Sequence, residues 1–72
     1  MIKIEQLLPL LKKGWVAMDS DGYWYYHKYK PTLRKRTEKD GCWGYGVDGL
    51  SDAFSIRKVK DWTKSLMRCG DE

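Results

Sequence analysis

The hairpin that decides the fold occupies residues 15–29, whose sequence is Trp15-Val16-Ala17-Met18-Asp19-Ser20-Asp21-Gly22-Tyr23-Trp24-Tyr25-Tyr26-His27-Lys28-Tyr29. Residues that favour β-strands, chiefly aromatic ones, lie on both sides of Asp21-Gly22. An Asp-Gly pair suits a tight turn because Gly adopts positive φ without a steric penalty and Asp tolerates it. The pattern predicts an antiparallel hairpin with strands at 15–18 and 23–29.

Two further Asp-Gly pairs, Asp40-Gly41 and Asp48-Gly49, follow in the middle of the chain. Segments 32–38 and 42–47 flank the first of them and predict a second hairpin. The other pair is expected to lead into a strand around 54–59. Together these segments predict a twisted antiparallel sheet of three to five strands.

The N-terminal segment has the spacing of a helix, with apolar residues at i, i+3, i+4 and i+7: Ile4, Leu7, Leu8 and Leu11. Pro9 lies inside this pattern, where it removes a hydrogen bond and crowds the preceding turn. The helix is therefore expected to be kinked or divided into two short turns, and Gly14 is expected to end it.

The C-terminal segment predicts a second, short helix. Asp61 is a suitable N-cap, Trp62 and Leu66 would face inward, and the helix would run through Cys69 and end at Gly70. The whole chain, residues 1–72, is thus expected to form a single small α+β domain. The expected core consists of Ile4, Leu7, Leu8, Leu11, Trp15, Ala17, Trp24, Trp43, Phe54, Ile56, Val59, Trp62 and Leu66.

Composition limits the classes of function. The net charge is +4 and the isoelectric point is near 9.1, which permits an anionic partner without requiring one. No run approaches the roughly 18 apolar residues of a membrane span, and the charges around the N-terminal leucines do not fit a signal peptide. Cys42 and Cys69 are expected to be free thiols in a reducing cytoplasm, although a disulfide between them stays open. Two Cys and His27 cannot complete a four-ligand zinc site without carboxylates, so we expect no metal and no other cofactor.

The aromatic strand supplies the first part of a candidate binding surface. Alternation places Trp24, Tyr26 and Lys28 on one face, and Tyr23, Tyr25, His27 and Tyr29 on the other. If Trp24 packs into the core with Trp15 or Ala17, the tyrosine face is left open, and exposed aromatic patches mark binding sites. The alternative is that a second layer, such as the C-terminal helix, covers this face, because a small domain needs its aromatic residues to fold.

A basic run supplies the second part. Arg34, Lys35 and Arg36 follow the tyrosines, with Lys28 and Lys30 between them. Tyrosine rings stack on unpaired bases, and Lys and Arg bind phosphates, so the combination favours single-stranded nucleic acid. The alternative is a solvated edge strand whose charges prevent aggregation.

The sequence contains no motif of a catalytic site, and His27 has no assignable acid or nucleophile beside it. We therefore expect a non-enzymatic binding module. Its ligand is expected to be single-stranded nucleic acid, with a protein partner on the same surface as the alternative. The residues expected to carry binding are Tyr23, Tyr25, Lys28, Tyr29, Lys30, Arg34, Lys35 and Arg36.

The first half of the chain also resembles a known group of proteins. The carrying residues are Gly14-Trp15-Val16-Ala17-Met18-Asp19-Ser20-Asp21-Gly22, then Trp24-Tyr25 and Lys30-Pro31. This part is similar to short uncharacterised bacteriophage and prophage proteins, which combine a short helix, an Asp-Gly hairpin and a Lys-Pro exit. The resemblance implies an intracellular bacterial setting and an accessory role in binding a host protein or nucleic acid. It implies no activity and no site residues.

Overall fold

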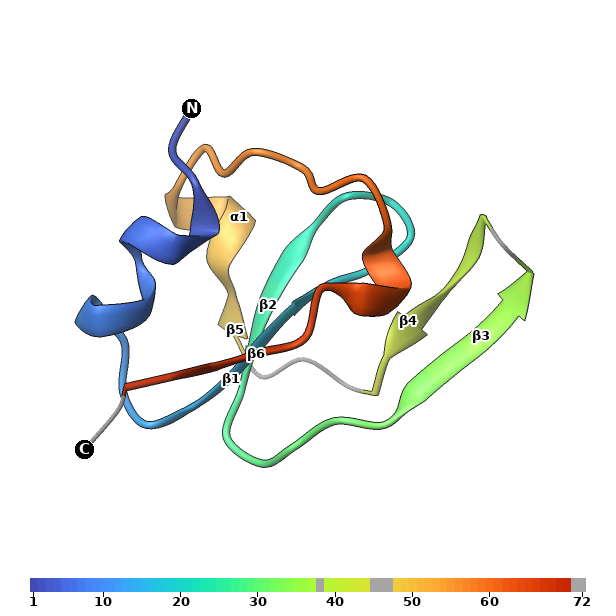
Figure 1. Ribbon diagram of the computed structural model, residues 1–72, viewed down its shortest axis with the longest axis horizontal. Coiled ribbons are helices and arrows are strands. Elements are labelled where there is room, and N and C mark those ends of the chain that lie inside the picture. The colour runs from blue at the N-terminus through green and yellow to red at the C-terminus, as the bar shows by residue number, and fades with distance from the viewer. Residues whose placement is uncertain (38, 45–47, 71–72) are drawn as a thin grey trace.

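The computed structural model describes residues 1–37, 39–44 and 48–70, which form a small α+β fold (Figure 1). Two short 3₁₀ helices, η1 (Ile4–Gln6) and η2 (Leu8–Leu10), precede the sheets. The main sheet is antiparallel, with strand order β5-β2-β1-β6. Its strands are β1 (Gly14–Met18), β2 (Trp24–His27), β5 (Asp48–Gly49) and β6 (Met67–Cys69). A second sheet pairs β3 (Leu33–Thr37) with β4 (Asp40–Trp43), and the remaining helices are α1 (Leu50–Ala53) and the 3₁₀ helix η3 (Trp62–Lys64).

The β1–β2 hairpin confirms the central prediction. Gly22 has a φ of 87°, as the turn requires, and the Asp21 carboxylate accepts a hydrogen bond from the Tyr23 N–H at 2.9 Å. The turn is longer than a two-residue loop, because Met18 pairs with Trp24 and five residues connect them. This register decides which side chains share a face of the sheet.

The N-terminal helix is divided as expected, with Pro9 inside the second turn, η2. However, Gly14 does not end it, since it is the first residue of β1. A Cβ atom at Gly14 would lie 2.6 Å from the His27 carbonyl oxygen and 2.7 Å from the Tyr26 hydroxyl. The glycine is therefore explained by close strand approach rather than by a helix cap.

The C-terminal helix is shorter than expected. Asp61 caps it, accepting a hydrogen bond from the Thr63 N–H at 3.0 Å, but η3 ends at Lys64. The chain then forms β6, in which Met67 pairs with Val16 and Cys69 with Gly14. Residues 67–69 therefore form a strand where a helix was expected. Pairing with the edge of β1 satisfies the backbone N–H and C=O groups of both segments.

The expectations for the middle of the chain are met in part. Strands β3 and β4 form the second hairpin, but Asp40-Gly41 lies within β4 rather than at its turn. Glu38 and residues 45–47 lie outside the described residues. The strand expected at 54–59 is wrong: Asp48-Gly49 forms β5 and leads into α1, and only Ile56 makes a bridge, with Ile2.

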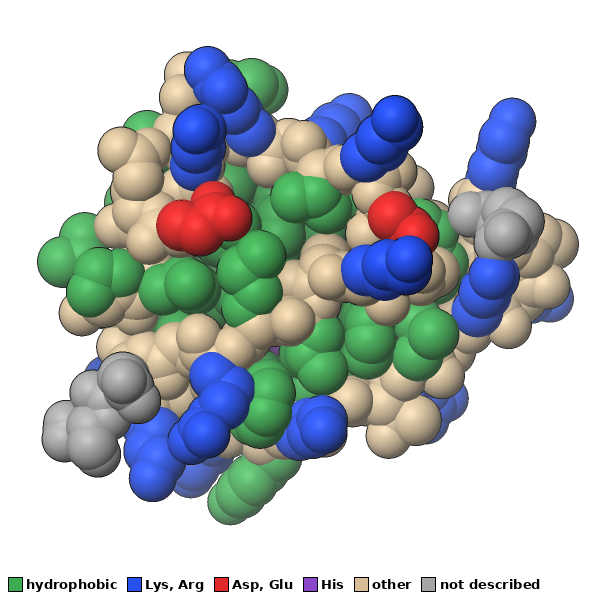
Figure 2. Space-filling model, in the orientation of Figure 1, with side chains coloured by type: hydrophobic (Ala, Val, Ile, Leu, Met, Phe, Trp, Pro, Cys, Tyr) green, Lys and Arg blue, Asp and Glu red, His purple; other side chains and the backbone are tan. Residues whose placement is uncertain are grey.

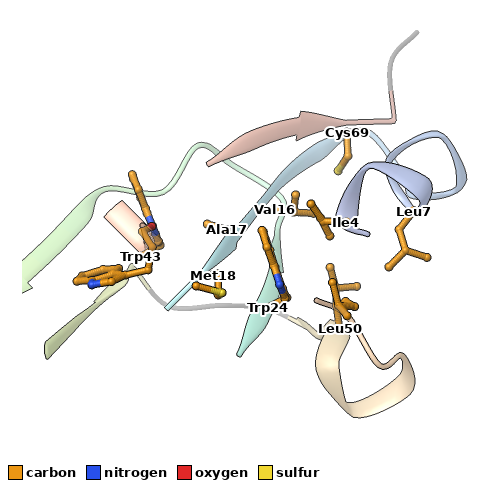
Figure 3. Close-up of a cluster of buried hydrophobic side chains, with 11 residues drawn as sticks. Ile4, Leu7, Val16, Ala17, Met18, Trp24, Trp43, Leu50 and Cys69 are labelled. Atoms are coloured by element: carbon orange, nitrogen blue, oxygen red, sulfur yellow. The ribbon is translucent and has the colours of Figure 1, made fainter. Parts of the chain in front are cut away.

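The core lies between the main sheet and the helices, as the side chains in Figure 3 show. It consists of Ile4, Leu7, Val16, Ala17, Met18, Trp24, Trp43, Leu50, Ile56, Trp62 and Cys69. Leu8, Leu11, Val59 and Leu66 pack around it while partly buried. Two expected core residues belong to neither group: Trp15 is only half-buried, and Phe54 is 42% exposed.

The register of the hairpin places Trp15 on the face of the main sheet opposite Trp24. Directly opposed residues of an antiparallel pair share a face, so Met18 and Val16 lie on the face of Trp24. Trp15 and Ala17, which pair with His27 and Tyr25, lie on the opposite face, which we call the outer face. Ala17 is fully buried there, whereas Trp15 is only half-buried. The expectation that Trp15 packs into the core with Trp24 is therefore wrong, whereas Ala17 is in the core as expected.

The β3–β4 hairpin is fixed to the end of β1 by hydrogen bonds. The Trp43 N–H donates to the Asp19 carboxylate at 2.9 Å, and the Ser20 hydroxyl bonds both backbone groups of Gly41. The Trp43 indole N–H donates to the Trp62 carbonyl at 2.9 Å. In Figure 1 the rest of the hairpin extends away from the main sheet.

Candidate binding surface

The tyrosine row is not uniformly exposed. Tyr23 and Tyr25 are half-buried, His27 is only 3% exposed, and Tyr29, which follows the end of β2, is 76% exposed. The open half of the row is thus its C-terminal end.

The other end of the row is close to carboxylates. The rings of Tyr23 and Tyr25 contact each other, with centroids 5.1 Å apart and planes tilted by 44°. Partial burial, and then the negative charges of Asp19 and Asp21, raise the pKa of the Tyr25 hydroxyl. Burial also raises the pKa of Asp19, although the hydrogen bond from the Trp43 N–H opposes this effect. Negative charge at this end disfavours a phosphate there.

The C-terminal end of the row is basic instead. The Lys28 Nζ lies 5.7 Å from the centre of the Tyr29 ring. The Lys30 Nζ lies 5.4 Å, and the Arg68 guanidinium carbon 5.7 Å, from the centre of the Trp15 ring. We call these five residues, Trp15, Lys28, Tyr29, Lys30 and Arg68, the basic-aromatic patch.

The cations of the patch have aromatic rather than acidic neighbours. Within residues 1–37, 39–44 and 48–70, Lys28, Lys30 and Arg68 form no ion pair with a carboxylate. Figure 2 shows Lys and Arg side chains at the lower, upper and right-hand edges of this view, whereas the visible Asp and Glu side chains lie nearer its middle. The patch therefore presents positive charge that no carboxylate of residues 1–37, 39–44 and 48–70 pairs with.

The basic run lies on β3, in which all five residues are exposed. Arg36 forms an ion pair with Asp40 at 3.9 Å, but both side chains are largely exposed, and such pairs contribute little. A shallow groove of about 660 Å³ follows this hairpin, lined by Leu33, Arg34, Lys35, Arg36, Asp40, Gly41 and Cys42. Charged side chains of β3 border this groove.

The expected site residues are thus distributed over three places. Lys28, Tyr29 and Lys30 meet in the basic-aromatic patch, Arg34 to Arg36 lie on β3, and Tyr23 with Tyr25 lies at the acidic end. Sequence reasoning missed Trp15, because it was assigned to the core, and Arg68, because it was assigned to a helix. The alternation of Met67, Arg68 and Cys69 was the available signal that this segment could be a strand.

His27 is buried beside the patch, directly across the hairpin from Trp15. Its Nε2 atom has no hydrogen-bond partner among the described residues, and burial lowers the pKa of the imidazole. No cluster of three or more His, Cys, Asp and Glu side chains suited to a metal ion occurs in the described part of the chain. Likewise, none of the helices formed by the described residues is long and apolar enough to cross a membrane.

The fold and this surface define a small α+β domain with a basic, aromatic outer face. No family model, no curated protein and no solved structure matches the chain. The resemblance of the first half to phage and prophage proteins therefore stays a prediction.

Proposed function

We propose that this protein is a non-enzymatic binding module that binds single-stranded nucleic acid through the basic-aromatic patch and the basic side chains of β3. The observation that carries the proposal is the set of three cations at the patch. They lie over the rings of Trp15 and Tyr29, and no described carboxylate pairs with them.

The chemistry of such a surface matches a single strand in two respects. Phosphates replace the counterions around Lys and Arg, and the release of these ions drives binding. Exposed rings stack on unpaired bases, and a duplex offers few of these because its bases are already stacked. The proposed order along the surface is stacking at the patch and phosphate contacts that continue to Arg34 and Arg36.

The proposed setting is the cytoplasm of a bacterial cell, where reducing conditions keep thiols free. Cys42 and Cys69 are both unbridged, in agreement with that setting. The acidic end at Tyr23 and Tyr25 plays a smaller part in this proposal than the sequence indicated, since Asp19 and Asp21 repel phosphate.

A salt titration tests the proposal. The affinity for a labelled single strand of about ten nucleotides is measured by fluorescence anisotropy between roughly 50 and 200 mM salt. Affinity is expected to fall steeply with salt. In Lys30→Gln the slope should decrease by about 0.7, the value for one lost single-strand phosphate contact.

Lys60→Gln is the matched control, since Lys60 is exposed, lies outside the patch and carries the same charge. It should leave the slope unchanged. Absence of binding at the lower salt concentration, or equal losses in both variants, would contradict the proposal. A protein partner on the same surface would then be the remaining candidate, identified by a weaker response to salt.

A further inference from the structure

Trp15 has an unusual position for the largest side chain of β1. It lies on the outer face, half-buried, while its neighbours Val16 and Ala17 are fully buried. Its ring contributes less to the core than those of Trp24, Trp43 and Trp62. An aromatic ring that is left partly exposed on the surface of a small domain is a candidate contact with a partner.

Two cations approach this ring from the two strands that flank β1. Arg68 is the direct neighbour of Trp15 in the β1–β6 pair, and Lys30 follows the end of β2 on the other side. Their charged groups lie 5.7 and 5.4 Å from the ring centre. Cation–π contacts at exposed sites are weak, so a stronger ligand can displace them.

We infer that Trp15 is the platform on which a base of the single strand stacks, with Lys30 and Arg68 binding the adjoining phosphates. This inference rests on the proposed function and names the unit that is recognised: an unpaired nucleotide. In a nucleotide strand, the base supplies a ring that stacks on the Trp15 indole. The phosphates supply anions for Lys30 and Arg68 when these side chains move off the indole. An acidic polymer without rings supplies only the anion.

The test compares a single strand of about ten nucleotides with an abasic strand of the same length and phosphate count. Both strands offer phosphates to Lys30 and Arg68, but only the base-bearing strand can stack on Trp15. The native protein should bind the base-bearing strand about 5- to 100-fold more tightly, which corresponds to the stacking of one base. In Trp15→Leu this preference should decrease by about the factor that one stacked base contributes, while affinity for the abasic strand stays within about twofold. Phe54→Leu removes a ring that is 42% exposed and should change neither affinity.

The outcomes separate the inference from the proposed function. If neither strand binds, the proposed function fails and the inference fails with it. If both bind with salt-dependent affinity but Trp15→Leu keeps the preference for bases, binding stands and the stacking role of Trp15 is wrong.

A second measurement covers the case in which Trp15→Leu does not fold. In the native protein, the indole N–H resonance of Trp15 should shift on addition of the base-bearing strand and much less with the abasic strand. The resonance of Trp24, which is buried and hydrogen-bonded to Arg57, should shift with neither. Equal shifts of Trp15 with both strands would overturn the inference.

Discussion

Replacement of Ser65 by Ala tests how the main sheet is completed just before β6 begins at Met67. Ser65 is 1% exposed, and its hydroxyl accepts a hydrogen bond from the Met18 N–H at 2.8 Å. The β1–β6 register, extended by two residues from Val16 and Met67, places Ser65 opposite Met18. The side-chain hydroxyl therefore takes the place of the next backbone partner of β1.

The expected cost follows from the group left unpaired. Ser65→Ala removes the acceptor of the Met18 N–H, and Met18 is only 4% exposed, so water cannot easily replace it. A buried donor without a partner costs about 1–3 kcal/mol. A domain of this size is expected to have an unfolding free energy of roughly 4–11 kcal/mol, so the loss is a substantial part of it.

Thermal denaturation followed by Trp fluorescence measures this loss. The melting temperature should fall by roughly 4–8 °C for each kcal/mol. Ser55→Ala is the control, because Ser55 is exposed and its hydroxyl bonds no described residue, and it should stay within about 0.5 kcal/mol of the native protein. If Ser65→Ala were as stable as Ser55→Ala, the role of the Ser65 hydroxyl in closing the sheet would be refuted.

Three further predictions concern the hairpin. Trp24→Ala should lower the free energy of unfolding by about 3–5 kcal/mol, since the side chain is fully buried and its indole N–H donates to the Arg57 carbonyl. A denaturation midpoint near that of the native protein would contradict this. Gly14→Ala should lower the free energy of unfolding by about 1–3 kcal/mol, because the added Cβ would lie 2.7 Å from the Tyr26 hydroxyl. An unchanged melting temperature would show that the strands can move apart without a loss of stability. Burial lowers the pKa of His27 below its ordinary value of 6.5, so the unfolded chain binds the proton more readily and stability should fall as pH decreases below that value. Urea midpoints at about pH 7.5 and 5.5 should show this fall, and it should be smaller in His27→Leu.

The sequence predicted the hairpin but not its register. A two-residue loop at Asp21-Gly22 would pair Met18 with Tyr25 and place Trp15 on the face of Trp24. The actual turn pairs Met18 with Trp24, and this shift of one residue moves Trp15 to the outer face. Turn length depends on hydrogen bonds such as that from the Asp19 N–H to the Tyr23 carbonyl, which composition does not reveal.

In the C-terminal segment, the local sequence pattern predicted where a helix begins but not where it ends. Asp61 correctly marked the start of a helix, because its carboxylate satisfies a nearby backbone N–H. The end of that helix depended on a distant partner, since Met67 to Cys69 forms a strand only where β1 offers an edge. Arg68 joined the candidate site through that pairing, so its place beside Trp15 was not predictable from neighbouring residues.

The candidate site was predictable where its residues are consecutive. Lys28, Tyr29 and Lys30 follow the end of β2 and meet at one end of the sheet, as their position in sequence indicated. Trp15 completes the patch only through tertiary structure. The acidic surroundings of Tyr25 likewise depend on the turn that brings Asp19 and Asp21 close to its ring.

The most direct test of the account is a residue-resolved NMR titration of the labelled protein with a short mixed-sequence single strand at low and moderate salt. We predict chemical-shift changes at Trp15, at 28–30, along β3 and at Arg68, and we predict that they weaken as salt increases. Shifts centred on Tyr23 and Tyr25, or no shifts at low salt, would contradict it.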